Sequence, residues 1–212
     1  NMLVQGVVET LYMTIASTAF GYIIGMPIGI LLVTSAKDGI RPCAWLFKTL
    51  DVIVNITRSI PFLILLVAVM PFTKTIVGTS IGSTATIVPL TLSAAPFIAR
   101  LVESSIKEVD KGIIEAAQSM GASNFKIIYK VMLPEAKPSL IVGSAIASTT
   151  ILGYSAMAGF VAGGGLGTIA INYGFYRYEK ELMFVTVALL VIIVQVMQAI
   201  GMKAAGISDK RK

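Results

Sequence analysis

The sequence has few charged residues, no histidine and a single cysteine, and each shortage excludes a class of protein. Charged residues make up 13% of the 212 positions, about half of the ~25% that soluble domains carry. So few charges cannot cover the surface of a soluble domain. A chain without histidine cannot form a His-containing zinc site or a Ser-His-Asp or Cys-His catalytic unit. Cys43 alone cannot form an intrachain disulfide, and we expect no metal or cofactor in this chain.

The residues that are present are largely apolar. Hydrophobic residues make up 56% of the chain, and the mean hydropathy is +0.85. This composition excludes disorder, which needs low hydrophobicity and high charge. At about 20 apolar residues per span, the chain has room for roughly four to six transmembrane helices. We therefore predict one all-α integral membrane domain over residues 1–212, embedded in the lipid bilayer, with no separate soluble catalytic domain.

Five apolar segments are long enough to cross a membrane. They run from about Val8 to Val33, Trp45 to Phe72, Ile81 to Val102, Ser139 to Tyr154 and Leu182 to Met202. The second segment carries Arg58 and Pro61, and a helix there is expected to break before the proline. A Gly-rich stretch, Gly159 to Gly174, separates the last two segments. It is predicted to be a loop or a re-entrant element, because irregular backbone at membrane depth must be buried or wetted.

Basic residues predict the orientation. The loops after the first and third spans and the C-terminal tail hold 13 of the 17 Lys and Arg residues, with Arg100 counted in the second of these loops. Lys74, Arg177 and Lys180 lie on the opposite side. The positive-inside rule makes the basic side cytoplasmic, which places the N-terminus outside and the C-terminus inside. The net charge of +6 then reflects topology. It does not indicate nucleic-acid binding, because no basic cluster with interleaved aromatics is present.

Small residues recur every four positions in the first span. Ser17, Gly21, Gly25 and Gly29 share one helix face. Such a stripe lets another helix approach closely, although glycine is also simply commoner in membrane helices. We predict helix packing along this stripe, with a partner helix in the same chain or in another copy.

The segment Glu103 to Pro138 is too polar to cross a membrane and has apolar residues at helical spacing. Two short amphipathic helices joined at Gly121 are predicted, with Ser123 as a candidate cap of the second and Pro134 and Pro138 at its close. They could lie on the lipid surface, pack beneath the chain's own helices, or dock a cytoplasmic partner.

The order of residues in this segment resembles the EAA signature of ABC importer permease subunits. The resemblance rests on Glu115-Ala116-Ala117, Gly121 and Val131-Met132-Leu133-Pro134, with Val131 in place of the usual Ile. It implies a type I ABC importer permease fold, in which residues 108–134 form a coupling loop that enters a groove of the ATP-hydrolysing subunit. The coupling residues implied are Glu115, Ala116, Ala117, Gly121, Ala122, Leu133 and Pro134.

Further segments are similar to the methionine-importer permeases. These are Arg58 to Phe62, Ala94 to Arg100, Gly153 to Met157 and Gly163 to Gly167. The resemblance implies a homodimer in the bacterial inner membrane. It also implies two ATP-binding subunits that hold ATP and Mg, and an extracellular methionine-binding lipoprotein. The chain has no G-x-x-x-x-G-K-[ST] loop, so it is predicted to be no ATPase itself.

Candidate path residues lie at the end of the fourth span. The resemblance implies that the segment with Tyr154, Ser155 and Met157 contributes to a central gate, although Tyr154 and Met157 could be ordinary core residues. Arg58 could contact the substrate carboxylate, because a charge within a span is a candidate functional group. It could equally snorkel to the interface or pair with Asp51.

The leading hypothesis is a permease that moves L- and D-methionine into the cytoplasm by alternating access. A permease for another amino acid or an osmolyte shares the same loop and is the alternative. An ion-coupled secondary transporter is less favoured, because Asp51 alone is a poor coupling acid.

Overall fold

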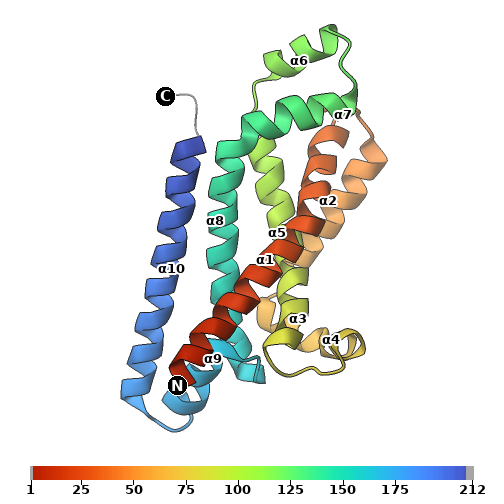
Figure 1. Cartoon of the computed structure of the whole chain (residues 1–212). Coiled ribbons are helices and arrows are strands. Elements are labelled where there is room, and N and C mark those ends of the chain that lie inside the picture. The colour runs from red at the N-terminus through yellow and green to blue at the C-terminus, as the bar shows by residue number, and fades with distance from the viewer. Residues whose placement is uncertain (1, 209–212) are drawn as a thin grey trace.

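The computed structural model describes residues 2–208, and this part of the chain is built from helices (Figure 1). Four long helices, α1 (Met2–Ser35), α5 (Ser83–Lys107), α8 (Leu133–Met157) and α10 (Lys180–Ser208), form the frame. By length and composition the structure has four helices able to cross a membrane, or five when a bent pair is counted as one span. The start of α1 and the end of α10 lie at opposite ends of the molecule.

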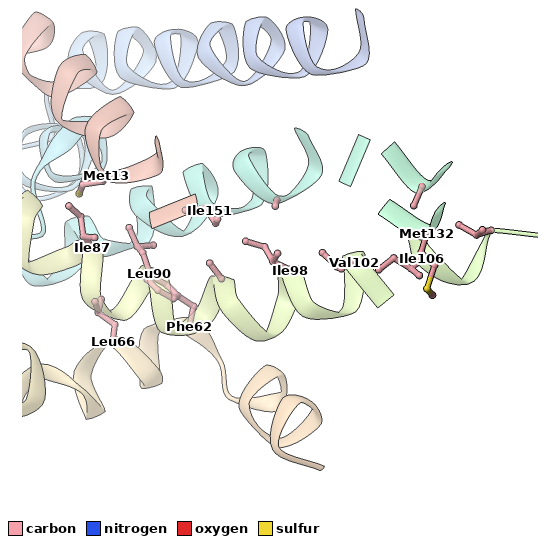
Figure 2. Close-up of a cluster of buried hydrophobic side chains, with 14 of the residues drawn as sticks. Met13, Phe62, Leu66, Ile87, Leu90, Ile98, Val102, Ile106, Met132 and Ile151 are labelled. Atoms are coloured by element: carbon pink, nitrogen blue, oxygen red, sulfur yellow. The ribbon is translucent and has the colours of Figure 1, made fainter. Parts of the chain in front are cut away.

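The core lies between α1, α5 and α8. Figure 2 shows Met13 from α1, Leu90, Ile98 and Val102 from α5, and Ile151 from α8 gathered in one cluster. Helix α5 is the central element, since two thirds of its apolar window is buried. Burial of such side chains on all sides is typical of a helix at the centre of a bundle.

The small-residue stripe of α1 lies directly against α5. A Cβ added at Gly25 would stand 2.5 Å from the Ala95 carbonyl oxygen, and one at Gly29 would stand 2.6 Å from the Ala99 oxygen. Ser17 donates a hydrogen bond to the Ile87 carbonyl at 3.5 Å. The packing partner is therefore in the same chain, and small residues are needed because the two backbones nearly touch.

The second apolar segment is broken into three helices. Helix α2 (Ala44–Ser59) ends just before Pro61, and α3 (Phe62–Ala68) continues at an angle of 99°. Helix α4 (Met70–Val77) follows. Ile60 takes an extended conformation, φ −79° and ψ 122°, because a following proline disfavours the α region. The span expected from Trp45 to Phe72 is thus bent at the predicted break.

The Gly-rich stretch forms short helical turns and not an open loop. The 3₁₀ turn η2 (Ala158–Val161), the helix α9 (Gly165–Ile169) and the π-helix η3 (Ala170–Phe175) lie beside the start of α1 (Figure 1). The Glu9 carboxylate accepts a hydrogen bond from the Gly165 N–H at 2.7 Å, and the Thr10 hydroxyl accepts one from Leu166 at 2.9 Å. These side chains satisfy backbone donors at the start of α9 that have no partner within that helix.

Candidate coupling and translocation site

Two helical pieces extend from one end of the bundle. Helix α6 (Lys111–Ser119) is followed by α7 (Asn124–Ile127), which continues through the π-helix η1 (Ile128–Met132) into α8. Figure 1 shows α6 as the outermost element at this end. Asp110 caps α6 by accepting a hydrogen bond from the Gly112 N–H at 2.7 Å. Gly121 has φ +76°, a conformation that glycine adopts without the penalty of a Cβ.

We call α6, the turn at Gly121 and α7 the α6–α7 hairpin. The prediction of two short amphipathic helices in this segment needs two corrections. Ser123 occupies the cap position of α7 but makes no side-chain hydrogen bond there. Pro134 and Pro138 do not close the segment, because both lie within α8, Pro134 in its first turn and Pro138 further along. The second amphipathic helix is consequently the start of the fourth span.

The structure separates the residues of the EAA-like signature by exposure. Glu115, Ala116, Gly121 and Pro134 are exposed, Ala122 and Leu133 are half-buried, and Ala117 is buried. The Ala122 N–H donates to the Ala117 carbonyl at 3.1 Å, which fixes the turn between α6 and α7. Ala117 therefore holds the hairpin together, while Glu115 and Ala116 are available to a partner.

An apolar surface at the hairpin was missed from the sequence. Met120, Phe125 and Tyr129 are 81%, 74% and 63% exposed, and the rings of Phe125 and Tyr129 stack with centroids 6.2 Å apart. Met120 and Phe125 fit a buried helical pattern by spacing, yet they point away from the core. The stacked pair Phe125–Tyr129 forms an exposed apolar patch of the kind that is a candidate for a partner contact. The four-residue spacing of Phe125 and Tyr129 places them on one helix face, and this spacing could have predicted the aromatic pair from the sequence.

A cavity of about 330 Å³ lies under α6. Its lining includes Asp38, Lys107, Lys111 and Glu115. Lys111 Nζ donates to Asp38 Oδ2 at 2.7 Å and so ties α6 to the connection between α1 and α2. The hydrogen bond from Lys111 lowers the pKa of Asp38, and the same bond raises the pKa of Lys111. Both side chains are exposed, so solvent screens the pair.

The three candidate path residues have different environments. Tyr154 is half-buried and stacks on Phe62 with centroids 4.8 Å apart, which joins α8 to α3. Met157 is 43% exposed. Ser155 is 1% exposed, and its hydroxyl donates to the Leu152 carbonyl within its own helix at 2.7 Å. Ser155 is thus inaccessible in this chain, whereas Tyr154 is partly exposed and Met157 is exposed.

Arg58 and Asp51 do not pair. Arg58 is exposed near the end of α2, and within residues 2–208 it forms no ion pair. Asp51 is instead bound by Arg100, which lies inside α5 and not in the loop where the charge count had placed it. Arg58 remains a candidate for the substrate carboxylate or for the membrane interface.

Arg100 is the centre of an ionic network that sequence reasoning missed. Its guanidinium donates to Glu103 Oε2 at 2.6 Å, to Asn55 Oδ1 at 2.8 Å and to Asp51. Lys107 donates to Glu103 Oε1 at 2.7 Å. Glu103 is buried and is therefore stable only with such partners. The spacing of Arg100, Glu103 and Lys107, three and four residues apart on one helix, was the available signal.

Together, the candidate spanning helices and the exposed hairpin at one end define a membrane-embedded protein with a surface that a partner could contact. The chain matches the family "Binding-protein-dependent transport system inner membrane component" over residues 21–211. It belongs to that family.

Relatives and solved structures agree with this assignment. The chain is 51% identical over 201 residues to the probable D-methionine transport system permease protein MetI of Vibrio cholerae, covering 95% of this chain and 89% of the relative. It is 54% identical over 158 residues to the D-methionine transport system permease protein MetI of Escherichia coli K12, covering 74% and 73%. A chain of the MetNI methionine ABC transporter, solved in inward-facing conformations, superposes with a TM-score of 0.97 at 49% identity over 99% of this chain and 97% of that one. An amino acid ABC transporter at 21% identity, TM-score 0.73, shares the fold over 100% and 94% of the chains.

Proposed function

We propose that this chain is the permease of an ATP-driven importer that moves L- and D-methionine into the cytoplasm by alternating access. The observation that carries the proposal is the exposed α6–α7 hairpin, which is continuous with a spanning helix and thus able to pass motion into the membrane. The methionine substrate is supported by the names of relatives at 51% and 54% identity.

Two copies of the chain, two ATP-binding subunits and an extracellular methionine-binding lipoprotein complete the proposed assembly. Five spans are few to enclose a path, and a two-fold pair would do so. The partner subunits would bind ATP and Mg and hydrolyse ATP. Nucleotide would bind one of the two conformations, inward-open or outward-open, more tightly than the other, and this difference in affinity would drive the exchange between them. The hairpin end would face the cytoplasm of a bacterial inner membrane, and the start of α1 would face outward.

Coupling is tested by ATP-driven uptake in vesicles that hold the complete assembly. Gly121→Pro and Glu115→Lys are expected to abolish uptake, the first by removing a backbone conformation with positive φ and the second by reversing an exposed charge. Gly78→Pro and Glu179→Lys are matched controls at the opposite end. Gly78 has φ +84°, and a Cβ added there would stand in open space, as it would at Gly121. Full uptake in both hairpin variants would refute the coupling role.

The path residues are tested by leak. Met157→Ala is expected to raise basal ATPase activity or passive methionine leak, because its exposed thioether would no longer narrow the path. Met202→Ala is the control, since Met202 is exposed on α10. A Met157 variant that is only less heat-stable, with uptake and leak unchanged, would assign Met157 to packing.

The substrate is tested by competition. Labelled methionine uptake should be inhibited by unlabelled D- or L-methionine at lower concentration than by other amino acids or by osmolytes. Equal inhibition by another amino acid would support the alternative substrate and leave the permease role intact. Retained methionine affinity in Arg58→Ala would remove Arg58 from the substrate contacts.

A further inference from the structure

Three cations and an exposed aromatic ring lie in the connection between α1 and α2 and in the first turns of α2. Lys37, Arg41 and Lys48 are exposed. Trp45 is 76% exposed and is the chain's one tryptophan. We call these four residues the Trp45 cluster. It lies at the same end of the molecule as the α6–α7 hairpin (Figure 1).

The connection is held in one conformation by backbone hydrogen bonds. The Arg41 N–H donates to the Thr34 carbonyl at 3.0 Å, and the Cys43 N–H donates to the Ser35 carbonyl at 3.0 Å. The chain therefore folds back on the last turn of α1 before α2 begins. This turn gathers the cations of residues 37–41 beside the first turns of α2.

The cations of the Trp45 cluster are not neutralised within the chain. The nearby acids are already occupied, since Asp38 pairs with Lys111 and Asp51 pairs with Arg100. Among residues 2–208, no carboxylate forms an ion pair with Lys37, Arg41 or Lys48. Three positive charges thus remain available to an external anion.

The exposed face of helix α2 indicates where the Trp45 cluster lies relative to the membrane. Trp45, Val52 and Ile56 are spaced seven and four residues apart and share one helix face. Val52 and Ile56 are 44% and 62% exposed, as expected of side chains that contact lipid tails. Tryptophan favours the headgroup level, so Trp45 marks the boundary of the bilayer, and the cations adjoin the phosphates.

We infer that the Trp45 cluster is a binding site for the headgroup of an anionic phospholipid, with Trp45 at the headgroup level and Lys37, Arg41 and Lys48 around the phosphate. Anionic lipid attracts each basic residue near the surface with about 1 kcal/mol, or roughly fivefold in local preference. A zwitterionic lipid has the same phosphate but no net charge, so it gains little. The inference does not depend on which substrate the permease moves.

Quenching of Trp45 tests the site directly. The full chain, assembled with its ATPase partner, is reconstituted in phosphatidylcholine vesicles with a minority of brominated phosphatidylglycerol. A second preparation carries the bromines on the phosphatidylcholine, at the same mole fraction and with the same amount of phosphatidylglycerol. Subtraction of the Trp45→Phe spectra isolates the emission of Trp45. Brominated phosphatidylglycerol should quench Trp45 several-fold more strongly than brominated phosphatidylcholine, and equal quenching would overturn the inference.

Charge removal and salt provide two controls. Replacing Lys37, Arg41 and Lys48 together by Gln should abolish the preference, while replacing Lys74, Arg177 and Lys180 at the opposite end by Gln should leave it unchanged. Raising the salt concentration should weaken the preference in the unaltered chain, because exposed charges are screened, so the test stands even if a variant folds poorly. If the first triple variant instead loses the co-purified ATPase subunit and keeps its lipid preference, the cluster is a protein-docking surface and the inference is wrong.

Discussion

Arg58 and Arg100 are both within apolar segments, yet their surroundings give them different roles. Arg100 on α5 binds Asp51 and Asn55 of α2, whereas Arg58 is exposed and forms no ion pair within the described chain. Removing Arg100 would leave Asp51 without its ion-pair partner and would leave the buried Glu103 with Lys107 alone, which is costly for a half-buried ionic network. Arg100 therefore stabilises the packing of two helices, and Arg58 is free for an external contact.

This difference predicts opposite sensitivities to the same substitution. Arg100→Gln should destabilise the chain by about 2 kcal/mol, which lowers the midpoint of thermal unfolding by roughly 4–8 °C. Arg58→Gln should change stability by no more than about 0.5 kcal/mol. The midpoints are measured on purified protein in detergent. Equal midpoints for the two variants would mean that the network does not hold α2 to α5.

Two helical glycines provide a second test at the residue scale. Gly25→Ala should destabilise by about 1–3 kcal/mol through overpacking, since its Cβ would meet the Ala95 oxygen at 2.5 Å. Gly153→Ala should be neutral or stabilising by about 0.5–1 kcal/mol, since nothing lies within 4 Å of its Cβ. Thermal unfolding of both variants distinguishes these outcomes. A stabilised Gly25 variant would contradict the close contact of α1 and α5.

At the scale of elements, α6 is tied to the α1–α2 connection by Lys111 and Asp38. The pKa of Asp38 is lowered, so its contribution to stability is present above the ordinary carboxyl pKa of ~3.9 and is lost as the pH falls through the lowered value. The pKa of Lys111 is raised, so its contribution is present below the ordinary ~10.4 and is lost as the pH rises through the raised value. The pair is therefore intact across the neutral range.

Comparison with Asp38→Asn over a pH series measures this contribution. The unaltered chain should unfold at a slightly higher temperature than the variant, with a constant difference between about pH 5 and pH 9. The difference should vanish in stronger acid, because the side chain at position 38 is then neutral in the unaltered chain as well as in the variant. A difference that instead grew as the pH fell would contradict the ion pair.

For the whole molecule, the single cysteine offers a test of orientation. Cys43 is exposed in the connection at the hairpin end, which we propose to face the cytoplasm. A membrane-impermeant maleimide should label the unaltered chain in inside-out vesicles and not in right-side-out vesicles. In the chain with Cys43→Ser and Thr79→Cys, labelling should reverse, because Thr79 is exposed in the connection between α4 and α5 at the other end. Labelling of Cys43 from outside would invert the proposed topology.

Much of the architecture followed from local sequence. Pro61 breaks the second apolar helix through a local steric effect that does not depend on the neighbouring helices. Long apolar segments form helices in lipid because every backbone polar group needs a hydrogen-bond partner within the chain. The spacing of Ser17, Gly21, Gly25 and Gly29 specifies a narrow helix face regardless of its neighbour. The turn at Gly121 was likewise predictable.

The predicted orientation also counted Lys210, Arg211 and Lys212 in the C-terminal tail, and these three residues lie outside the described part of the chain.

Other features depended on which surfaces meet. Periodicity placed Met120 and Phe125 on an apolar face but could not say that the face is uncovered. The family resemblance grouped Ser155 with Tyr154 as path residues, but only the packing of α8 shows that Ser155 is buried. Arg100 and Asp51 are 49 positions apart, and no local pattern relates them.

By itself, the sequence determined the membrane class, the helices and their breaks, because these arise from backbone hydrogen bonding and hydrophobicity. The tertiary structure alone decided which charges pair and which side chains remain exposed, because burial and ion pairing depend on neighbours distant in the chain.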